Sequence, residues 1–208
     1  MICRFLGNAC LEIVSVNNHF IVDPNYLEPP KKGIGKVFLT HEHDDHTDAE
    51  KIKRIHDLYI REDKDFQLFG PTSVKDKVPI EPILVENGTK IELKDGSVEV
   101  FEIECWKSEK CLAYLIEIDD KRILHTADSA KYSYELRRIQ KGINYCFVAC
   151  FEDFFDDYLF FIKTILPKTT IPYHFGKGDE EMAKKLVEYL KQNKINSRYM
   201  EIGSEIRI

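Results

Sequence analysis

The sequence predicts an α+β fold in which two sheets pack face to face and helices cover both outer sides. Three observations support this. Short apolar runs fill the middle of the chain, helical patterns lie toward both ends, and neither a repeat nor a linker interrupts the 208 residues. Strand-rich and helix-rich segments can bury their apolar faces together as a four-layer αββα sandwich. We therefore expect a single domain over 1–208.

Strands are expected wherever a short apolar run lies between turn residues. Asn17-Asn18 is the first such turn, and it separates the two runs of an N-terminal hairpin. Asn87-Gly88 and Asp95-Gly96 mark later turns. The expected strands cover 9–16, 19–22, 36–40, 67–69, 82–85, 90–93, 98–105, 112–118, 122–126, 143–149, 169–173, 198–202 and 205–208.

Helices are expected where apolar residues recur at helical spacing. Thr47 and Asp48 can cap a first helix, in which Ile52 and Ile55 would face the core. Further helices alternate with the last strands, near 133–140, 155–166 and 179–192. Aromatic and acidic residues mix at 151–161, which indicates either core packing under an acidic surface or an aromatic lip over a site.

Composition indicates a globular protein and argues against nucleic-acid and membrane partners. Hydrophobic residues make up 43% and charged residues 32%, a balance typical of globular domains. The net charge of −6 opposes binding to nucleic acid. The N-terminus lacks the pattern of a signal peptide and no apolar run is long enough to span a membrane, so we expect a cytoplasmic protein without nucleic-acid or membrane partners. Six cysteines without a C-x-x-C pair are then expected to be buried thiols.

A dense histidine cluster carries the strongest chemical signal. The segment 40–46 reads Thr-His-Glu-His-Asp-Asp-His and follows a short buried strand. It therefore gathers His41, His43, Asp45 and His46 in the turn before the first helix. Imidazole nitrogen and carboxylate oxygen together suit zinc, iron or manganese. The sequence thus predicts a divalent metal site.

This segment resembles the H-x-H-x-D-H signature of the metallo-β-lactamase superfamily. Three other features agree in chain order. Residues 6–9 with 21–24 look like the opening hairpin of small lactonase-like hydrolases, 126–129 is similar to the motif of the bridging aspartate, and 171–174 resembles the last ligand motif. The resemblance covers about residues 6 to 176. It implies the αββα fold and metal-dependent hydrolysis.

The resemblance also assigns the ligands. It makes His41 and His43 ligands of one metal, with Asp128 as the bridge to a second. Asp45, His46 and His174 would hold that second metal.

The superfamily's third histidine on the first metal would lie near Lys107, and no histidine is present there. Three outcomes stay open. The second site holds one metal tightly, which we favour; Cys105 substitutes as a ligand; or the first metal binds weakly and completes its shell with water or substrate. Lys107 can also hold a substrate anion.

The implied reaction is attack on a small ester, lactone or phosphoester by a metal-bound hydroxide. Asp45 would orient this nucleophile and pass its proton to the leaving group. One or two ions are expected, most simply zinc, with manganese or iron as alternatives. Two other functions remain open: a degenerate member that binds metal or ligand without turnover, and an iron oxidoreductase. The substrate is expected to be a small molecule, and the sequence does not fix the oligomeric state.

Overall fold

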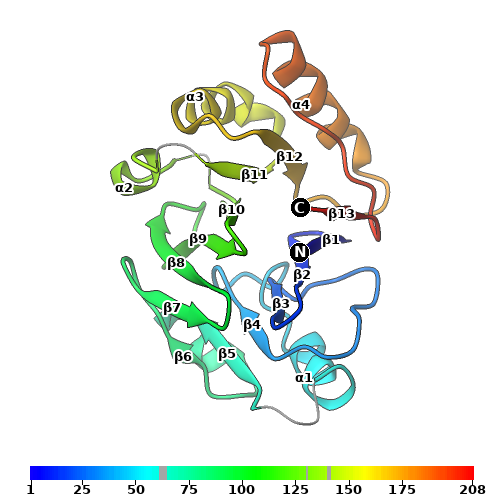
Figure 1. Ribbon diagram of the computed structural model, residues 1–208, viewed down its shortest axis with the longest axis vertical. Helices are drawn as coiled ribbons and strands as arrows, with labels where there is room; N and C mark the ends of the chain where they lie inside the picture. Colours follow the sequence, from blue (N-terminus) through cyan, green and yellow to red (C-terminus); the bar gives the residue numbers. More distant parts are fainter. Residues whose placement is uncertain (61–64, 130, 140–141) are drawn as a thin grey trace.

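The computed structural model describes residues 1–60, 65–129, 131–139 and 142–208 (Figure 1). Within these ranges the strands form two sheets, one of seven strands and one of six. The first has the order β13-β1-β2-β3-β4-β5-β6 and consists of Glu205–Arg207, Ile2–Gly7, Cys10–Val14, His19–Val22, Lys36–Phe38, Gln67–Gly70 and Ile83–Leu84. The second has the order β12-β11-β10-β9-β8-β7 and consists of Thr169–Tyr173, Ile143–Ala149, Lys121–His125, Cys111–Ile118, Gly96–Ile103 and Lys90–Leu93.

Both faces of the first sheet are buried. On β3, Phe20 and Val22 belong to the large core cluster, which includes residues of both sheets. Ile21 between them belongs to a second cluster, together with Ile52 and Ile55 of helix α1 (Ala49–Leu58). Because neighbouring side chains of a strand point to opposite faces, α1 covers the side of this sheet that faces away from the other sheet.

The second sheet carries its helices on the opposite side of the molecule. Figure 1 shows α3 (Phe155–Ile165) and α4 (Glu180–Gln192) beside β11 and β12, and α2 (Tyr134–Arg137) close by. Short 3₁₀ helices at Thr72–Lys77 and Glu152–Phe154 complete the described elements. The four layers confirm the predicted αββα sandwich. In the described part of the chain, no helix combines the length and hydropathy needed to cross a membrane.

Two strand predictions at the chain ends need correction. Strand β1 was not predicted, and it lies between β2 and β13 in the first sheet. The strand expected at 198–202 is wrong. None of these residues lies in a strand, and the neighbouring Ser197 forms only an isolated bridge with Thr170. Burial of Met200 against the core accounts for the apolar character of that segment. Of the helix expected at 133–140, Gln140 lies outside the described residues.

The prediction that all six cysteines are free thiols is wrong for two of them. Cys105 and Cys111 form a disulfide, whereas the other four are free and buried. The reason is the register of β8 and β9, which places Ile103 opposite Cys111 in an antiparallel pair. The loop at 104–110 therefore returns Cys105 toward Cys111. The short spacing between the two cysteines in the sequence does not by itself predict this disulfide.

Candidate metal centre

All the candidate ligands follow the ends of strands. The segment 41–46 lies between β4 and α1, Asp128 comes shortly after β10, and His174 directly follows β12. These segments belong to different sheets and are far apart in sequence, yet their side chains converge on one place. The structure thus brings together all six residues that the sequence nominated.

Four of these residues form the more complete cluster, which we call the four-donor group: Asp45, His46, Asp128 and His174. Asp128 Oδ1 lies 2.8 Å from His46 Nε2 and 3.1 Å from His174 Nε2. The two Nε2 atoms are 3.0 Å apart, and Asp45 Oδ2 lies 3.3 Å from His174 Nε2. One atom from each residue thus points toward a common centre.

His41, His43 and Asp128 make up a three-donor group beside it. The His41 and His43 rings meet edge to face with centroids 4.6 Å apart. His41 Nε2 lies 3.7 Å from Asp128 Oδ2. Asp128 therefore takes part in both groups, as expected of a bridging carboxylate.

These residues fit a cation. Among the described residues, no hydrogen-bond partner is found for the buried His41 Nε2. Two imidazole nitrogens that face each other, as those of His46 and His174 do, repel unless a proton or a metal lies between them. Ligands bound at 2.0–2.1 Å in a tetrahedral zinc site are roughly 3.3 Å apart, which is close to the distances in the four-donor group.

The charges around the cluster also favour a positive charge at its centre. Burial lowers the pKa of His46, but Asp128 and Asp23 outweigh it and raise that pKa well above its ordinary value. Burial would raise the pKa of Asp128, yet the nearby histidines, His46 first, hold it well below its usual range. Burial and the neighbouring His46 lower the pKa of His41 to about 4, so its imidazole is neutral and able to bind metal.

Asp23 and Thr40 hold two of the histidines in position. The buried Asp23 accepts hydrogen bonds from the backbone N–H of Thr40 at 2.8 Å and from its hydroxyl at 2.7 Å. His46 Nδ1 lies 2.7 Å from Asp23 Oδ2, and His41 Nδ1 lies 3.0 Å from Thr40 Oγ1. Because each Nδ1 has a partner, each Nε2 is directed toward the cluster. The sequence had marked Asp23 only as a landmark before proline, and nothing in the pattern named its partners.

The backbone is strained next to two ligands. His174 has φ +67° and Ala127, which precedes Asp128, has φ +46°. Non-glycine residues in this left-handed region cost of order 1 kcal/mol each and persist where surrounding contacts enforce them. Such conformations concentrate at functional sites, in agreement with the position of both residues at the cluster.

A cavity of about 600 Å³ opens over the cluster. Four candidate ligands line it, namely His43, Asp45, Asp128 and His174, and its other lining residues are Glu104, Cys105, Trp106, Lys131, Phe151 and Phe154. The Phe151 ring lies 5.0 Å from that of His174. Tyr158 and Phe161, which follow on α3, are instead buried in the core. The segment 151–161 thus contributes both core residues and part of an aromatic rim.

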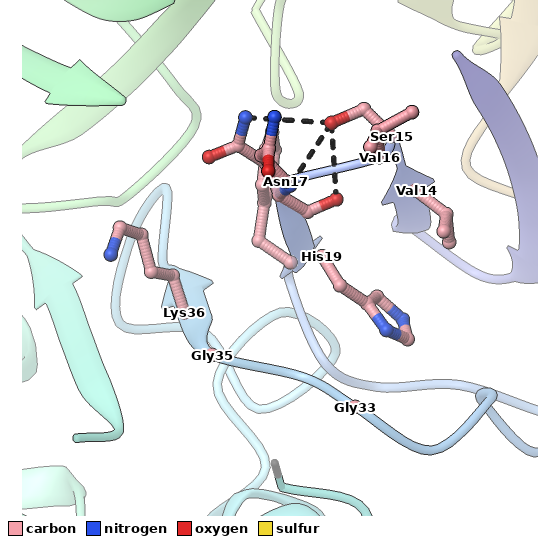
Figure 2. A pocket seen from close by; sticks show the side chains of 10 residues that line it. Val14, Ser15, Val16, Asn17, His19, Gly33, Gly35 and Lys36 are labelled. Atoms are coloured by element: carbon pink, nitrogen blue, oxygen red, sulfur yellow. Dashed lines mark hydrogen bonds between the residues drawn. The ribbon is translucent and has the colours of Figure 1, made fainter. Parts of the chain in front are cut away.

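A second cavity, of about 330 Å³, lies at the turn between β2 and β3 (Figure 2). Among its lining residues, His19 alone is of a type that commonly binds metal, and its Nε2 lies 2.8 Å from Glu12. Ser15 and Asn18 are hydrogen-bonded to each other across the turn. This cavity is a feature of the hairpin and offers no second group of ligands.

The remaining sequence candidates lie outside the ligand groups. His56 is exposed on α1 beside Asp57. His125 is buried, with its Nε2 3.4 Å from the Ala9 carbonyl oxygen. Lys107 places its Nζ 4.3 Å from the centroid of the Trp106 ring. Lys107 thus contacts a residue of the cavity rim, at the position where the third histidine was expected.

The comparison with known families agrees with this arrangement. The sequence profile of the beta-lactamase superfamily domain matches residues 4–175, which include every residue of both ligand groups. The chain belongs to the metallo-β-lactamase superfamily. The match confirms the resemblance seen in the motifs, and no curated protein matches the chain.

Solved structures support the superfamily fold. Igni18, a metallo hydrolase from Ignicoccus hospitalis, is 15% identical with a TM-score of 0.75, over 99% of this chain and 97% of that one. The metallo-beta-lactamase fold protein YhfI from Bacillus subtilis is 12% identical with a TM-score of 0.79, over 99% of both chains. CmlA, a diiron β-hydroxylase from Streptomyces venezuelae, is 13% identical with a TM-score of 0.74, over 100% of this chain and 54% of that one. At these identities the likeness concerns the fold alone.

Proposed function

We propose that this superfamily member is a metal-dependent hydrolase of a small ester, lactone or phosphoester. The observation that carries the proposal is the convergence of donor atoms from three strand ends at the lining of one cavity. A hydrolytic site needs a cation with room beside it for substrate and water. The cavity of about 600 Å³ offers that room.

The four-donor group would hold one cation, for which we propose zinc, and the less complete three-donor group is the candidate site for a second. When bound, such a metal supplies positive charge that polarises a substrate oxygen and lowers the pKa of water toward ~7. Asp23 and Thr40 would keep the ligands of both groups aligned for this task.

Asp45 is suited to proton transfer. Its side chain is half exposed at the cavity, and a hydrogen bond with His174 lowers its pKa to about 2. It is therefore an ionised carboxylate at neutral pH, able to accept a proton from the attacking water. The same group can then donate that proton to the leaving group.

The cavity walls favour a small substrate with an apolar part. Trp106, Phe151 and Phe154 provide aromatic surface, and Lys131 provides a positive charge that is paired with Glu104 at 3.6 Å. The net charge of −6 argues against nucleic acid. A cytoplasmic location is part of the same proposal, and the oligomeric state stays open.

The test is hydrolysis by the full chain after loading with zinc, manganese or iron. We expect at least one bound metal per chain and turnover of one class among chromogenic carboxylic esters, lactones and phosphodiesters. His174→Ala should abolish that turnover. His56→Ala is the matched control, because it removes an exposed histidine outside both ligand groups.

Three results would redirect the proposal. Bound metal without turnover of any substrate class would favour a binding protein, an interpretation that the missing third histidine supports. Bound iron with oxygen consumption would favour an oxidoreductase. Absence of bound metal would contradict the hydrolase, the oxidoreductase and a metal-binding protein alike.

A further inference from the structure

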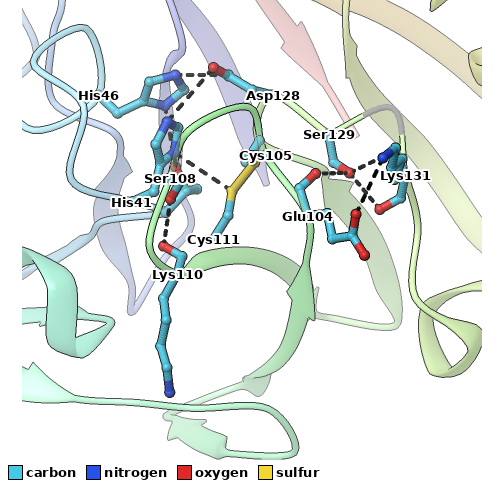
Figure 3. Close-up of a disulfide and its surroundings, with 12 residues drawn as sticks. His41, His46, Glu104, Cys105, Ser108, Lys110, Cys111, Asp128, Ser129 and Lys131 are labelled. Atoms are coloured by element: carbon cyan, nitrogen blue, oxygen red, sulfur yellow. Dashed lines mark hydrogen bonds and ion pairs between the residues drawn. A yellow bond between two sulfur atoms is a disulfide. The ribbon is translucent and has the colours of Figure 1, made fainter.

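A disulfide lies beside the candidate metal centre. Cys105 is joined to Cys111, and Cys111 Sγ lies 3.7 Å from His41 Nδ1. One ring nitrogen of His41 and the two sulfur atoms all lie within 4.8 Å of one another. Figure 3 shows the sulfur pair next to His41, with His46 and Asp128 close by. Cys111 Sγ thus contacts a candidate ligand, and Cys105 Sγ lies close to the same ring.

This disulfide borders the side of the centre that has fewer ligands. The three-donor group has only His41 and His43 for itself, because Asp128 also belongs to the four-donor group. Lys107 does not compensate, since its Nζ lies over the Trp106 ring. A second cation would therefore lack a protein ligand unless another donor approaches.

Cys105 is the donor best placed to approach. It lines the same cavity as His43 and Asp128, whereas Cys111 is only 1% exposed and faces His41 Nδ1, not the Nε2 that is directed toward the cluster. A thiolate is among the strongest protein ligands for zinc. A sulfur held in a disulfide carries no such negative charge, so the pair offers this donor only when it is reduced.

We propose that Cys105 and Cys111 form a redox-controlled ligand for a second metal ion. Reduction by a dithiol breaks the S–S bond with two electrons and two protons; two thiols form on the protein, and the dithiol closes into its own disulfide. Cys105 then releases its proton to solvent on binding metal and completes the three-donor group. Oxidation of the pair withdraws the ligand and leaves only the four-donor group occupied. The proposal rests on the proposed metal-dependent function.

The experiment titrates metal-free full-length chain with Co²⁺ in two forms, one reduced by dithiothreitol and then desalted, the other oxidised. The reduced form should bind two ions per chain and develop a thiolate-to-cobalt charge-transfer absorption with the second. The oxidised form should bind one ion and lack that absorption. Hydrolytic activity is not needed for either readout.

Variants separate the roles of the two sulfur atoms. Cys105→Ser should lose the second ion and the absorption even when reduced. Cys111→Ser keeps Cys105 but cannot form the disulfide, so it should bind two ions after treatment with oxidised dithiothreitol. Cys146→Ala is the matched control, because it removes a buried thiol outside the cavity and should behave like the unmodified chain.

The outcomes distinguish this inference from the proposed function. One ion in both redox forms, or two ions in both, would overturn the inference and leave the hydrolase proposal standing. Two ions without the charge-transfer absorption would also overturn it. No bound ion in either form would overturn both.

Discussion

Single side chains differ in how much of the metal centre depends on them. His46 and His174 belong to the four-donor group, whereas His43 belongs to the less complete one. We therefore expect His46→Ala and His174→Ala to lose metal more severely than His43→Ala. Metal content after exhaustive dialysis checks this order. Equal loss from all three variants would contradict tighter binding by the four-donor group.

Asp45 should matter more for turnover than for metal content. Asp45→Asn keeps a side-chain oxygen but removes the carboxylate that is ionised at neutral pH. Turnover per bound metal should fall by roughly 10² or more, the usual contribution of a general base. Parallel assays of kcat and metal content check this, and unchanged turnover per bound metal would remove Asp45 from the reaction.

Thr40 is predicted to act through the ligands it positions. Thr40→Val keeps the side-chain shape but removes the hydroxyl between Asp23 and His41. The loss of such a supporting hydrogen bond typically weakens metal affinity by roughly 10-fold or more. Competition with a chromogenic chelator measures this change. Thr40→Ser, which restores the hydroxyl, should recover most of the affinity; a variant with serine as weak as the valine one would indicate a packing effect.

For single residues, the sequence predicted which side chains come together in the metal centre but not which side chains position them. The motif at 41–46 indicated its ligands because a dense cluster of imidazole and carboxylate groups usually binds metal. The partners of Asp23 depend on how the β3 end lies against the β4 end, which no local pattern encodes. The Cys105–Cys111 pair depends likewise on the register of β8 and β9.

Among the helices, α1 follows the histidine segment and begins at a well-defined cap. The side chain of Asp48 accepts a hydrogen bond from the Lys51 backbone N–H at 3.0 Å. Asp48→Ala should lower the free energy of unfolding by about 1 kcal/mol, the usual effect of a lost cap. Asp48→Asn should have a much smaller effect. Urea unfolding of both variants checks this, and equal losses would show that charge, and not capping, is the cause.

Most elements were predictable because their apolar periodicity is strong. The hairpin of β2 and β3, helix α1 and the strand–helix alternation of the last third agree with the sequence predictions. Strand β1 was missed because Arg4 interrupts its apolar run, although that side chain is paired with Glu12 on β2. Periodicity reports burial, but it does not report charged pairs between neighbouring strands.

For the molecule as a whole, Glu12 predicts how stability depends on pH. This carboxylate is buried in the first sheet beside Arg4, His19 and the Lys31 backbone N–H. Burial would raise the pKa of Glu12, but the hydrogen bonds with His19 and Lys31 outweigh it and lower that pKa below its ordinary 4.5. The ionised form therefore stabilises the fold above pH 4.5, and this contribution is lost as pH falls through the lowered native pKa.

Glu12→Gln isolates that contribution. The variant should unfold about 1–2 kcal/mol more easily than the unmodified chain at pH 7, because it loses charge-assisted hydrogen bonds. The difference should shrink at pH values below 4.5. Urea unfolding of both metal-free proteins across this range measures it. A difference that stays constant or grows toward low pH would contradict the assignment.

The architecture of the whole molecule was predictable, since two buried sheet faces and outer helices follow from the apolar pattern. The cavity was not, because its walls come from three separate segments, represented by Trp106, Lys131 and Phe151, whose relative positions depend on the complete fold. A single domain over 1–208 stays a prediction. Both ligand groups depend on the whole fold, because each takes side chains from strand ends of both sheets.

The most direct measurement is anomalous diffraction at the zinc edge from crystals of the full chain grown with zinc. The account predicts a peak enclosed by Asp45, His46, Asp128 and His174. Data from crystals saturated with zinc that show no peak among these four side chains would contradict it.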